Sequence, residues 1–113
     1  MAKTLFERIA DKEIPAVLLH EDEQCIAFAD IDPQAPVHFL VVPRKPIPSL
    51  DHLELGDEEL VGHLFIVAKQ VAKAQGIRKG YRAVFNCGED AFQTVPHLHL
   101  HILGGRKMGW PPG

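Results

Sequence analysis

The stretch of sequence that decides the fold is the run His97-Leu98-His99-Leu100-His101. Side chains alternate between the two faces of a β-strand, so a strand over residues 97–103 would place three histidines on one face and the aliphatic residues on the other. Three imidazoles in a row are costly to bury, and apolar residues or threonine suit a strand better. The run therefore predicts a strand with one face in the core and a functional site on the other.

The sequence on the N-terminal side of this run predicts four further strands. Apolar runs bounded by charged or turn-forming residues indicate strands over residues 17–20, 25–30, 38–43 and 81–87. The first two are separated by Glu21-Asp22-Glu23 and are expected to form a hairpin. The run at 38–43 is apolar on both faces, which is typical of a central strand.

Two helices are predicted beside these strands. Thr4 and Glu7 have the spacing of a capping box, so we expect a short helix that begins there and is stopped by Pro15. Apolar residues at helical spacing predict one long helix from an N-cap at Asp57 to Gly76. The residues expected on the buried side of the short helix are Leu5, Phe6 and Ile9.

Together these elements predict an α+β fold, in which an antiparallel sheet of about five strands carries the long helix across one face. A chain of 113 residues can bury one core, so residues 1–113 are expected to form a single domain.

Composition narrows the class of protein. Hydrophobic residues make up 46% and charged residues 24% of the chain, as in ordinary globular proteins. The formal net charge is −3 and the basic residues are dispersed, so no nucleic acid partner is expected. Cys25 and Cys87 are too few for a disulfide scaffold and are expected to be half-buried strand thiols. The first residues lack a secretory signal and no apolar run approaches a membrane span, so we expect a soluble, cytoplasmic protein with no membrane partner.

Two kinds of chemistry fit three histidines on one strand face. Two histidines at i and i+2 can share a metal ion if another element supplies a third ligand, for which His38, His20 and Cys87 are candidates. Alternatively, one histidine is a nucleophile or general acid–base, and the others orient it and bind an anionic substrate. The residue types alone leave both interpretations open. Outside these sites, His20, His52 and His63 are expected to lie in no cluster, as surface or locally satisfied histidines.

Five segments of the chain match a known family pattern. They are Lys12-Glu13-Ile14-Pro15-Ala16, residues 32–43, Gly80-Tyr81-Arg82, the histidine run with Gly104-Gly105-Arg106, and the ending Gly109-Trp110-Pro111-Pro112-Gly113. They resemble the histidine triad (HIT) superfamily, specifically its HINT-like nucleotide-binding phosphoramidase branch. The resemblance implies a homodimer whose two sheets join. It also implies hydrolysis of purine nucleoside phosphoramidates, such as AMP–amine conjugates, and of acyl-adenylates.

The resemblance also implies roles for four histidines. His99 would attack the α-phosphorus and become a nucleotidyl-histidine, and His38 would hold it in its reactive tautomer. His97 and His101 would bind phosphate oxygens or the leaving group. An imidazole with an ordinary pKa near 6.5 is largely neutral at pH 7 and can attack phosphorus without a strong base. No cofactor is therefore expected; zinc can bind histidines but is not expected to be needed for catalysis.

The nucleotide-binding residues follow from the same resemblance. Asp30 would accept hydrogen bonds from both ribose hydroxyls, and Trp110 would pack near the partner subunit's site. Asn86, on the strand before the histidine run, and Thr94 would donate to phosphate or to the leaving group. The residues expected to line the base pocket are Phe6, Ile9, Phe28 and Ile31. From composition alone these apolar residues fit core packing equally well.

Three features depart from the branch pattern. Ala91 and Phe92 stand where Gly-Gly is usual, so the loop facing phosphate loses backbone freedom and gains bulk. Thr94 replaces a frequent serine and keeps its hydroxyl. Pro96 replaces a frequent tyrosine and fixes φ before the histidine run. The alternative functions are a dinucleoside polyphosphate hydrolase, a nucleotide-binding regulator without significant catalysis and a zinc-binding protein.

Overall fold

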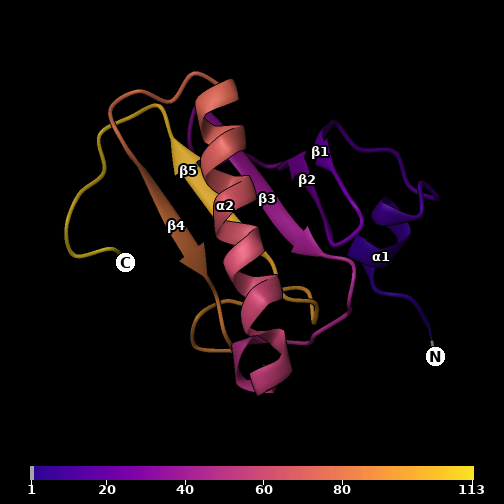
Figure 1. Cartoon of the computed structure of the whole chain (residues 1–113). Coiled ribbons are helices and arrows are strands. Elements are labelled where there is room, and N and C mark those ends of the chain that lie inside the picture. Colours follow the sequence, from indigo (N-terminus) through magenta and orange to yellow (C-terminus); the bar gives the residue numbers. More distant parts are fainter. Residues whose placement is uncertain (1) are drawn as a thin grey trace.

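Five strands form one antiparallel sheet in the computed structural model, which describes residues 2–113 (Figure 1). They are β1 (Leu18–Glu21), β2 (Cys25–Ala29), β3 (Val37–Pro43), β4 (Tyr81–Phe85) and β5 (Leu100–Gly104). Their order across the sheet is β1-β2-β3-β5-β4, and every neighbouring pair is antiparallel. The predicted α+β class with a five-stranded antiparallel sheet is confirmed.

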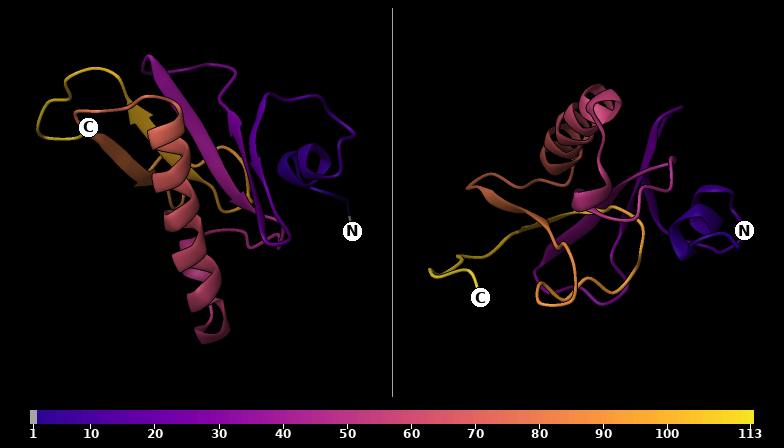
Figure 2. Two further views of the ribbon diagram at one scale, coloured as in Figure 1. Left: turned by 45° about the horizontal axis from the view of Figure 1, so that its top comes forward. Right: turned by 90° about the horizontal axis from the view of Figure 1, so that it is seen from below.

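Two α-helices lie on different sides of the sheet (Figure 2). The short helix α1 is Leu5–Ala10, and the long helix α2 is Glu58–Ala74. Two 3₁₀ turns, η1 (Leu50–His52) and η2 (Leu55–Asp57), lead into α2. Both predicted helices are therefore present, and no helix among residues 2–113 is long and apolar enough to cross a membrane.

Alternation along the central strands decides which side chains meet α2. Phe39 and Val41 of β3 and Leu100 and Ile102 of β5 are almost completely buried on the α2 side. The buried α2 residues in the same cluster are Leu64, Val67, Ala68, Val71 and Ala72. Burying one large aliphatic or aromatic side chain contributes about 1.5–3 kcal/mol, so this sealed face is the main apolar core.

The opposite face carries a smaller apolar cluster under α1. Phe6 and Ile9 pack against Ile26, Phe28, Leu40 and Val42. The predicted capping box is confirmed: the amide of Glu7 donates to Thr4 Oγ1 at 3.1 Å, and the amide of Thr4 donates to the Glu7 carboxylate at 2.9 Å. This cluster is built on β2 and β3, and beside it the region where β3 meets β5 stays partly open.

Several predicted details of the helices are wrong. Leu5 is 46% exposed and does not share the buried side of α1. The helix ends at Ala10, well before Pro15. Just after this end, Lys12 takes a left-handed backbone conformation with φ of 62°. Asp57 does occupy the predicted N-cap position, but its side chain does not cap α2, because the carboxylate accepts from the amide of Glu54 and the ammonium of Lys45.

Two strand boundaries also differ from the prediction. The strand β4 ends at Phe85, so Asn86 and Cys87 lie in the following loop. The strand β5 begins at Leu100, so His97 precedes it and the alternation does not extend that far. The predicted pair of half-buried strand thiols is correspondingly wrong: Cys25 is fully buried on β2, and Cys87 is partly exposed in a loop.

Candidate active site

The candidate site lies where β3 and β5 run side by side, on the face opposite α2. His38 comes from β3, His101 from β5, and His99 directly precedes β5. In the β3–β5 register, Leu40 is opposite His101 and His38 is opposite Leu103. The pairing brings His38 and His101 together diagonally, with Nε2 of the first 2.9 Å from Nδ1 of the second.

His97 lies beneath this site instead of lining it. Its side chain is fully buried, and Nε2 is 2.7 Å from the carbonyl oxygen of Pro43. Since a carbonyl only accepts, Nε2 carries the proton, and the Thr4 hydroxyl donates to Nδ1 at 2.6 Å. Both ring nitrogens are therefore occupied within the protein. The expectation that His97 contacts phosphate or the leaving group is wrong for this arrangement.

The orientation of His99 is decided by a backbone carbonyl. Its Nδ1 is 2.7 Å from the carbonyl oxygen of His97, so Nδ1–H is the donor. In the neutral ring, Nε2 then holds a free electron pair. We expected His38 to hold this tautomer, but the His97 main chain does so, because His38 bonds to His101 instead. Phe6 packs edge-on against the His99 ring, with 4.9 Å between ring centroids.

A second chain of hydrogen bonds orients His101. The amide of Gln34 donates to Nδ1 of His38 at 3.0 Å, which leaves the proton of neutral His38 on Nε2. That Nε2–H donates to Nδ1 of His101, so neutral His101 carries its own proton on Nε2. The Asp30 carboxylate lies 3.4 Å from Nε2 of His38. The site thus offers one free imidazole electron pair, on His99, beside one imidazole N–H donor, on His101.

Burial keeps these imidazoles neutral. It lowers the pKa of His99, against the raising effects of the His97 carbonyl and the Asp30 charge. Burial likewise lowers the pKa of His38, opposed by Asp30 and Asp32. The pKa of His101 falls to about 4 because of burial, with further lowering from His99 and His38. Neutral rings at pH 7 suit a nitrogen nucleophile, since protonation would remove the attacking electron pair.

Two adjoining cavities meet at His99 and His101. The larger is a polar cleft of about 630 Å³, and the smaller is an apolar pocket of about 270 Å³. Predicted residues that line the cleft are Asp30, His38, Asn86, Thr94, His99 and His101. Those that line the apolar pocket are Phe6, Ile9, Phe28 and Ile31, together with Asp30, Thr94, His99 and His101. Ile31 is 98% exposed, so it lies at the mouth of the pocket and not in the core.

Two arginines in the cleft were not predicted as site residues. Arg82 and Arg106 line it together with Val84 and Leu103. The signal for Arg82 was available, because alternation along β4 places it on the same face as Val84. Arg106 is held by a hydrogen bond from its guanidinium to the Gln34 carbonyl oxygen at 3.2 Å. Their guanidinium groups offer charged N–H donors to an anionic ligand, in a cleft that Asp30 and Asp32 also line.

Trp110 lies outside both cavities and is 83% exposed. Its ring is 5.8 Å from the guanidinium carbon of Arg82, and Met108 and Pro112 of the same tail line the cleft. The tail therefore runs beside its own subunit's cleft while the indole faces outward. Packing against a partner subunit's site stays a prediction.

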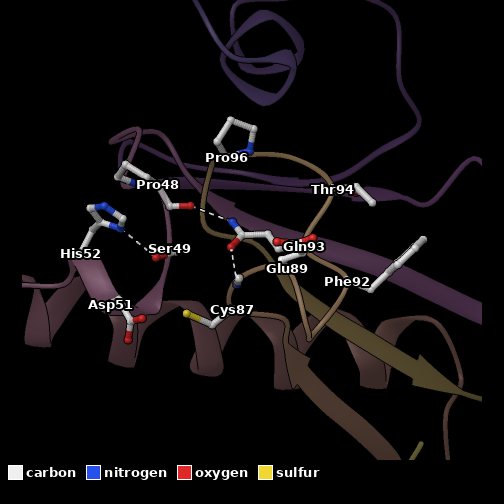
Figure 3. Close-up of a pocket in the computed structure, with 11 residues that line it drawn as sticks. Pro48, Ser49, Asp51, His52, Cys87, Glu89, Phe92, Gln93, Thr94 and Pro96 are labelled. Atoms are coloured by element: carbon white, nitrogen blue, oxygen red, sulfur yellow. Dashed lines mark hydrogen bonds between the residues drawn. The ribbon is translucent and has the colours of Figure 1, made fainter.

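The loop that follows β4 lines a third cavity of about 600 Å³ (Figure 3), and its Phe92 and Thr94 also line the cleft. Gln93 stands at its centre: its amide nitrogen donates to the Pro48 carbonyl oxygen at 2.7 Å, and its oxygen accepts from the amide of Gly88 at 3.0 Å. Phe92 has φ of 61°, the left-handed conformation that suits the glycine usual at this position. Its amide donates to the Glu89 carbonyl oxygen at 3.0 Å, so it is already used within the loop.

The predicted metal ligands separate into different places. Of the three candidates for a third ligand, only His38 lies with the triad, where donor atoms of Asp30, His38 and His101 are all within 4.8 Å of one another. Hydrogen bonds already connect this group. Cys87 lines the third cavity, and His20 lies on β1.

His52 forms a local hydrogen bond with Ser49 at 2.7 Å, as expected for a locally satisfied histidine. The expectation that His20 and His63 lie in no cluster is wrong, since both form hydrogen bonds with Asp22.

Comparison with known proteins agrees with this arrangement. Residues 11–108 match the family model described as the HIT domain. An uncharacterised HIT-like protein of Synechocystis sp. is 52% identical over 110 residues, which cover 97% of this chain and 96% of the relative. A crystal structure described as a HIT family hydrolase of Legionella pneumophila superposes with a TM-score of 0.95, at 47% identity over 98% of this chain and 100% of that one. A histidine triad protein of Clostridium difficile gives 0.91, at 40% identity over 96% and 97% of the two chains.

Proposed function

The chain belongs to the HIT family, and we propose that it hydrolyses purine nucleoside phosphoramidates and acyl-adenylates through a nucleotidyl group carried on His99. The observation that carries the proposal is that two histidines with complementary tautomers, one with a free electron pair and one with a free N–H, lie where two cavities meet. The free Nε2 electron pair of His99 and the Nε2–H of His101 stand between the apolar pocket and the polar cleft. Relatives described as HIT family hydrolases support hydrolysis as the reaction class.

Substrate binding divides between the two cavities. The apolar pocket under α1 takes the purine between Phe6, Phe28 and Ile31, where burial of ring area drives binding. Asp30 lines both cavities, which supports its carboxylate as the acceptor for the ribose hydroxyls. The phosphate then reaches the histidines, and the leaving group extends into the cleft.

The first step transfers the nucleotidyl group to the protein. Nε2 of His99 attacks the α-phosphorus, a P–N bond to His99 forms, and the P–N bond to the amine breaks as that nitrogen takes a proton from solvent. The ring becomes cationic, and its Nδ1–H stays on the His97 carbonyl oxygen, whose dipole stabilises the charge. The His101 Nε2–H and the two arginines stabilise the phosphoryl oxygens.

The second step restores the enzyme. Water attacks phosphorus, the P–N bond to His99 breaks, and the nucleoside monophosphate leaves as one proton returns to solvent. Splitting the displacement into two steps replaces direct attack by water with attack by a better nucleophile. No metal ion is needed in this scheme, since N–H donors and guanidinium groups supply the positive charge.

We also propose that two copies join along β4. This strand is an edge of the sheet, and an edge presents unpaired backbone groups. Exposed aromatic side chains lie at this edge: Tyr81 of β4 is 43% exposed, and Phe65 of α2, 44% exposed, packs edge-on against Phe85 of β4 with 5.9 Å between ring centroids. A second sheet added here covers these residues and brings a partner's tail near the cleft. Sedimentation should give a dimer for the wild type and a monomer for Phe65→Asp.

The test of the proposed activity is turnover of adenosine 5′-phosphoramidate by the wild type and by His99→Asn, each with and without EDTA. We expect the wild type to release AMP equally in EDTA and the variant to release none. Loss of activity in EDTA with recovery in zinc would make the triad a metal site. Binding of AMP without turnover under either condition would favour a nucleotide-binding regulator.

A further inference from the structure

A second cluster of histidines lies on the α2 side of the sheet, away from the active site. His20 comes from β1, Asp22 from the turn, Cys25 from β2 and His63 from α2. One potential ligand atom from each of the four lies within 4.8 Å of the other three. Cys25 belongs to the α2-side core, whereas His38 and His101 face the cleft on the other side. The sheet therefore separates the two clusters.

One carboxylate oxygen is the meeting point of the cluster. Asp22 Oδ2 is 2.7 Å from Nε2 of His20 and 2.7 Å from Nε2 of His63. It is also 3.6 Å from Sγ of Cys25. Two imidazoles and one thiol are more donors than this oxygen needs to have its hydrogen-bonding capacity filled. They form a compact set of nitrogen, sulfur and oxygen donors.

The carboxylate is held in place by its other oxygen. Asp22 Oδ1 accepts from the amide of Gln24 at 2.7 Å and from the amide of Cys25 at 2.8 Å. The guanidinium of Arg44 also donates to the Asp22 carbonyl oxygen at 2.8 Å. These bonds fix the turn and aim Oδ2 at the histidines. Backbone and side-chain support of this kind orients ligands in protein metal sites.

Burial around the cluster is graded from the core to the solvent. The Cys25 side chain is fully buried, and the side chains of His20, Asp22 and His63 are 27%, 27% and 31% exposed. An ion from solvent thus meets the imidazoles and carboxylate first and has the sulfur at the base.

We propose that His20, Asp22, Cys25 and His63 bind one Zn²⁺ ion in tetrahedral coordination. Zinc bonds are about 2.0–2.2 Å to nitrogen and oxygen and about 2.3 Å to sulfur, so tetrahedral ligand atoms stand roughly 3.3–3.7 Å apart. From Asp22 Oδ2, the two imidazole nitrogens lie at 2.7 Å and the sulfur at 3.6 Å, and all four ligand atoms lie within 4.8 Å of one another, so shifts of under about 1 Å at the imidazoles give tetrahedral spacing. The thiol selects zinc over magnesium or calcium, which prefer all-oxygen sites.

Ion binding also requires an exchange of protons. Without metal, the two imidazole Nε2–H groups donate to Asp22. With metal, the thiol loses its proton to solvent as the sulfur–zinc bond forms, and each imidazole proton moves from Nε2 to Nδ1. No oxidation or reduction takes place. The ion would connect the β1–β2 hairpin to α2, so its role is structural and is independent of the proposed hydrolysis.

The test uses cobalt as a spectroscopic substitute for zinc in the full chain. Metal-free wild type titrated with Co²⁺ should bind one equivalent and show a sulfur-to-cobalt charge-transfer band in the near ultraviolet. His63→Gln and His20→Gln keep an amide donor for Asp22 but remove a ligand, and should weaken binding by more than about 100-fold. His101→Asn is the matched control on the other cluster and should bind cobalt like the wild type.

Thermal unfolding provides a second readout. Zinc at one hundred times its Kd should raise the Tm of the wild type by roughly 10 °C or more, and should not raise that of His63→Gln. Circular dichroism without metal confirms that each variant is folded. No sulfur–cobalt band in the wild type would overturn the proposal, as would a band that His63→Gln retains or that only His101→Asn removes.

Discussion

The two faces of the sheet are made from alternate residues of the same strands, yet they differ in what they bury. On the α2 side, Leu100 and Ile102 pack into a sealed apolar core. On the other side, His99 and His101 face a cleft. Apolar burial makes no directional demand, whereas a buried imidazole nitrogen without a partner costs about 1–3 kcal/mol.

On the face that carries the histidines, backbone groups supply the hydrogen bonds that avoid this cost. The carbonyls of Pro43 and His97 and the amide of Gln34 each bind one ring nitrogen. They leave free the two nitrogens that a substrate can use. The alternation of one strand can therefore build both a core and a reactive centre, provided that neighbouring loops supply hydrogen bonds for the polar half.

The largest expected contrast is between the neighbours His99 and Leu100. His99→Asn keeps a donor for the His97 carbonyl, so the free energy of unfolding should change by about 1 kcal/mol, while kcat falls at least about 10³-fold. Leu100→Ala should cost about 2–5 kcal/mol of stability and leave kcat of the folded protein nearly unchanged. Urea unfolding and steady-state kinetics measure both. If His99→Asn is unfolded, or Leu100→Ala is folded but inactive, the conclusion that one face serves catalysis and the other serves stability is contradicted.

A smaller effect is expected at Thr4, which connects α1 to the site through His97. Thr4→Val removes the helix cap and the hydroxyl donor to His97, and should cost about 1–2 kcal/mol of stability. We expect kcat to fall roughly tenfold with KM unchanged, since misplacing a reacting group by a fraction of an ångström is costly. Thr4→Ser should restore kcat. A raised KM with unchanged kcat would mean that Thr4 serves only the base pocket.

The pH dependence tests the buried state of the imidazoles. Burial lowers the pKa of His99 below its usual value of 6.5, so its free electron pair persists as the pH falls below 6.5. The acid limb of kcat/KM should therefore lie below pH 6.5. The unfolded chain gains protons from pH 6.5 downward, and the folded chain does so only near the lowered pKa values. The free energy of unfolding should thus decrease as the pH falls from about 6.5 toward 4. An acid limb at or above pH 6.5 would contradict the dominance of burial over the Asp30 charge and the His97 carbonyl at His99.

The smallest expected effect is at Phe92. A left-handed backbone costs a non-glycine residue roughly 1–2 kcal/mol, and glycine forfeits part of that gain to the entropy of the unfolded chain. Phe92→Gly should therefore raise the free energy of unfolding by at most about 1 kcal/mol, since this side chain is 80% exposed. Urea unfolding measures the change. A loss of stability would mean that the exposed Phe92 ring makes stabilising contacts in the native protein.

Local pattern predicted the five strands, both helices and the capping box. It failed at His97, where the alternation continues in sequence but the backbone does not continue the strand. There the amide of Leu98 donates to the Ile47 carbonyl oxygen, outside the sheet ladder. Such a bond depends on a distant loop, and no period within residues 97–103 records it.

The same limit explains the second histidine cluster. His20 and His63 are separated by more than forty positions, and each looks isolated along the chain. Packing of α2 on the β1–β2 hairpin brings them to one carboxylate oxygen. Family resemblance predicted the base-pocket residues and gave no signal for this cluster.

The most direct test of the central claim is mass spectrometry of wild-type protein quenched during its first turnover of adenosine 5′-phosphoramidate in EDTA. The proposed mechanism predicts one nucleotidyl group, located on the peptide that contains His99, which disappears as AMP is released. The same peptide from His99→Asn should carry none. Turnover without an adduct, an adduct on another residue, or an adduct that forms only after metal is added would contradict a metal-free His99 nucleophile.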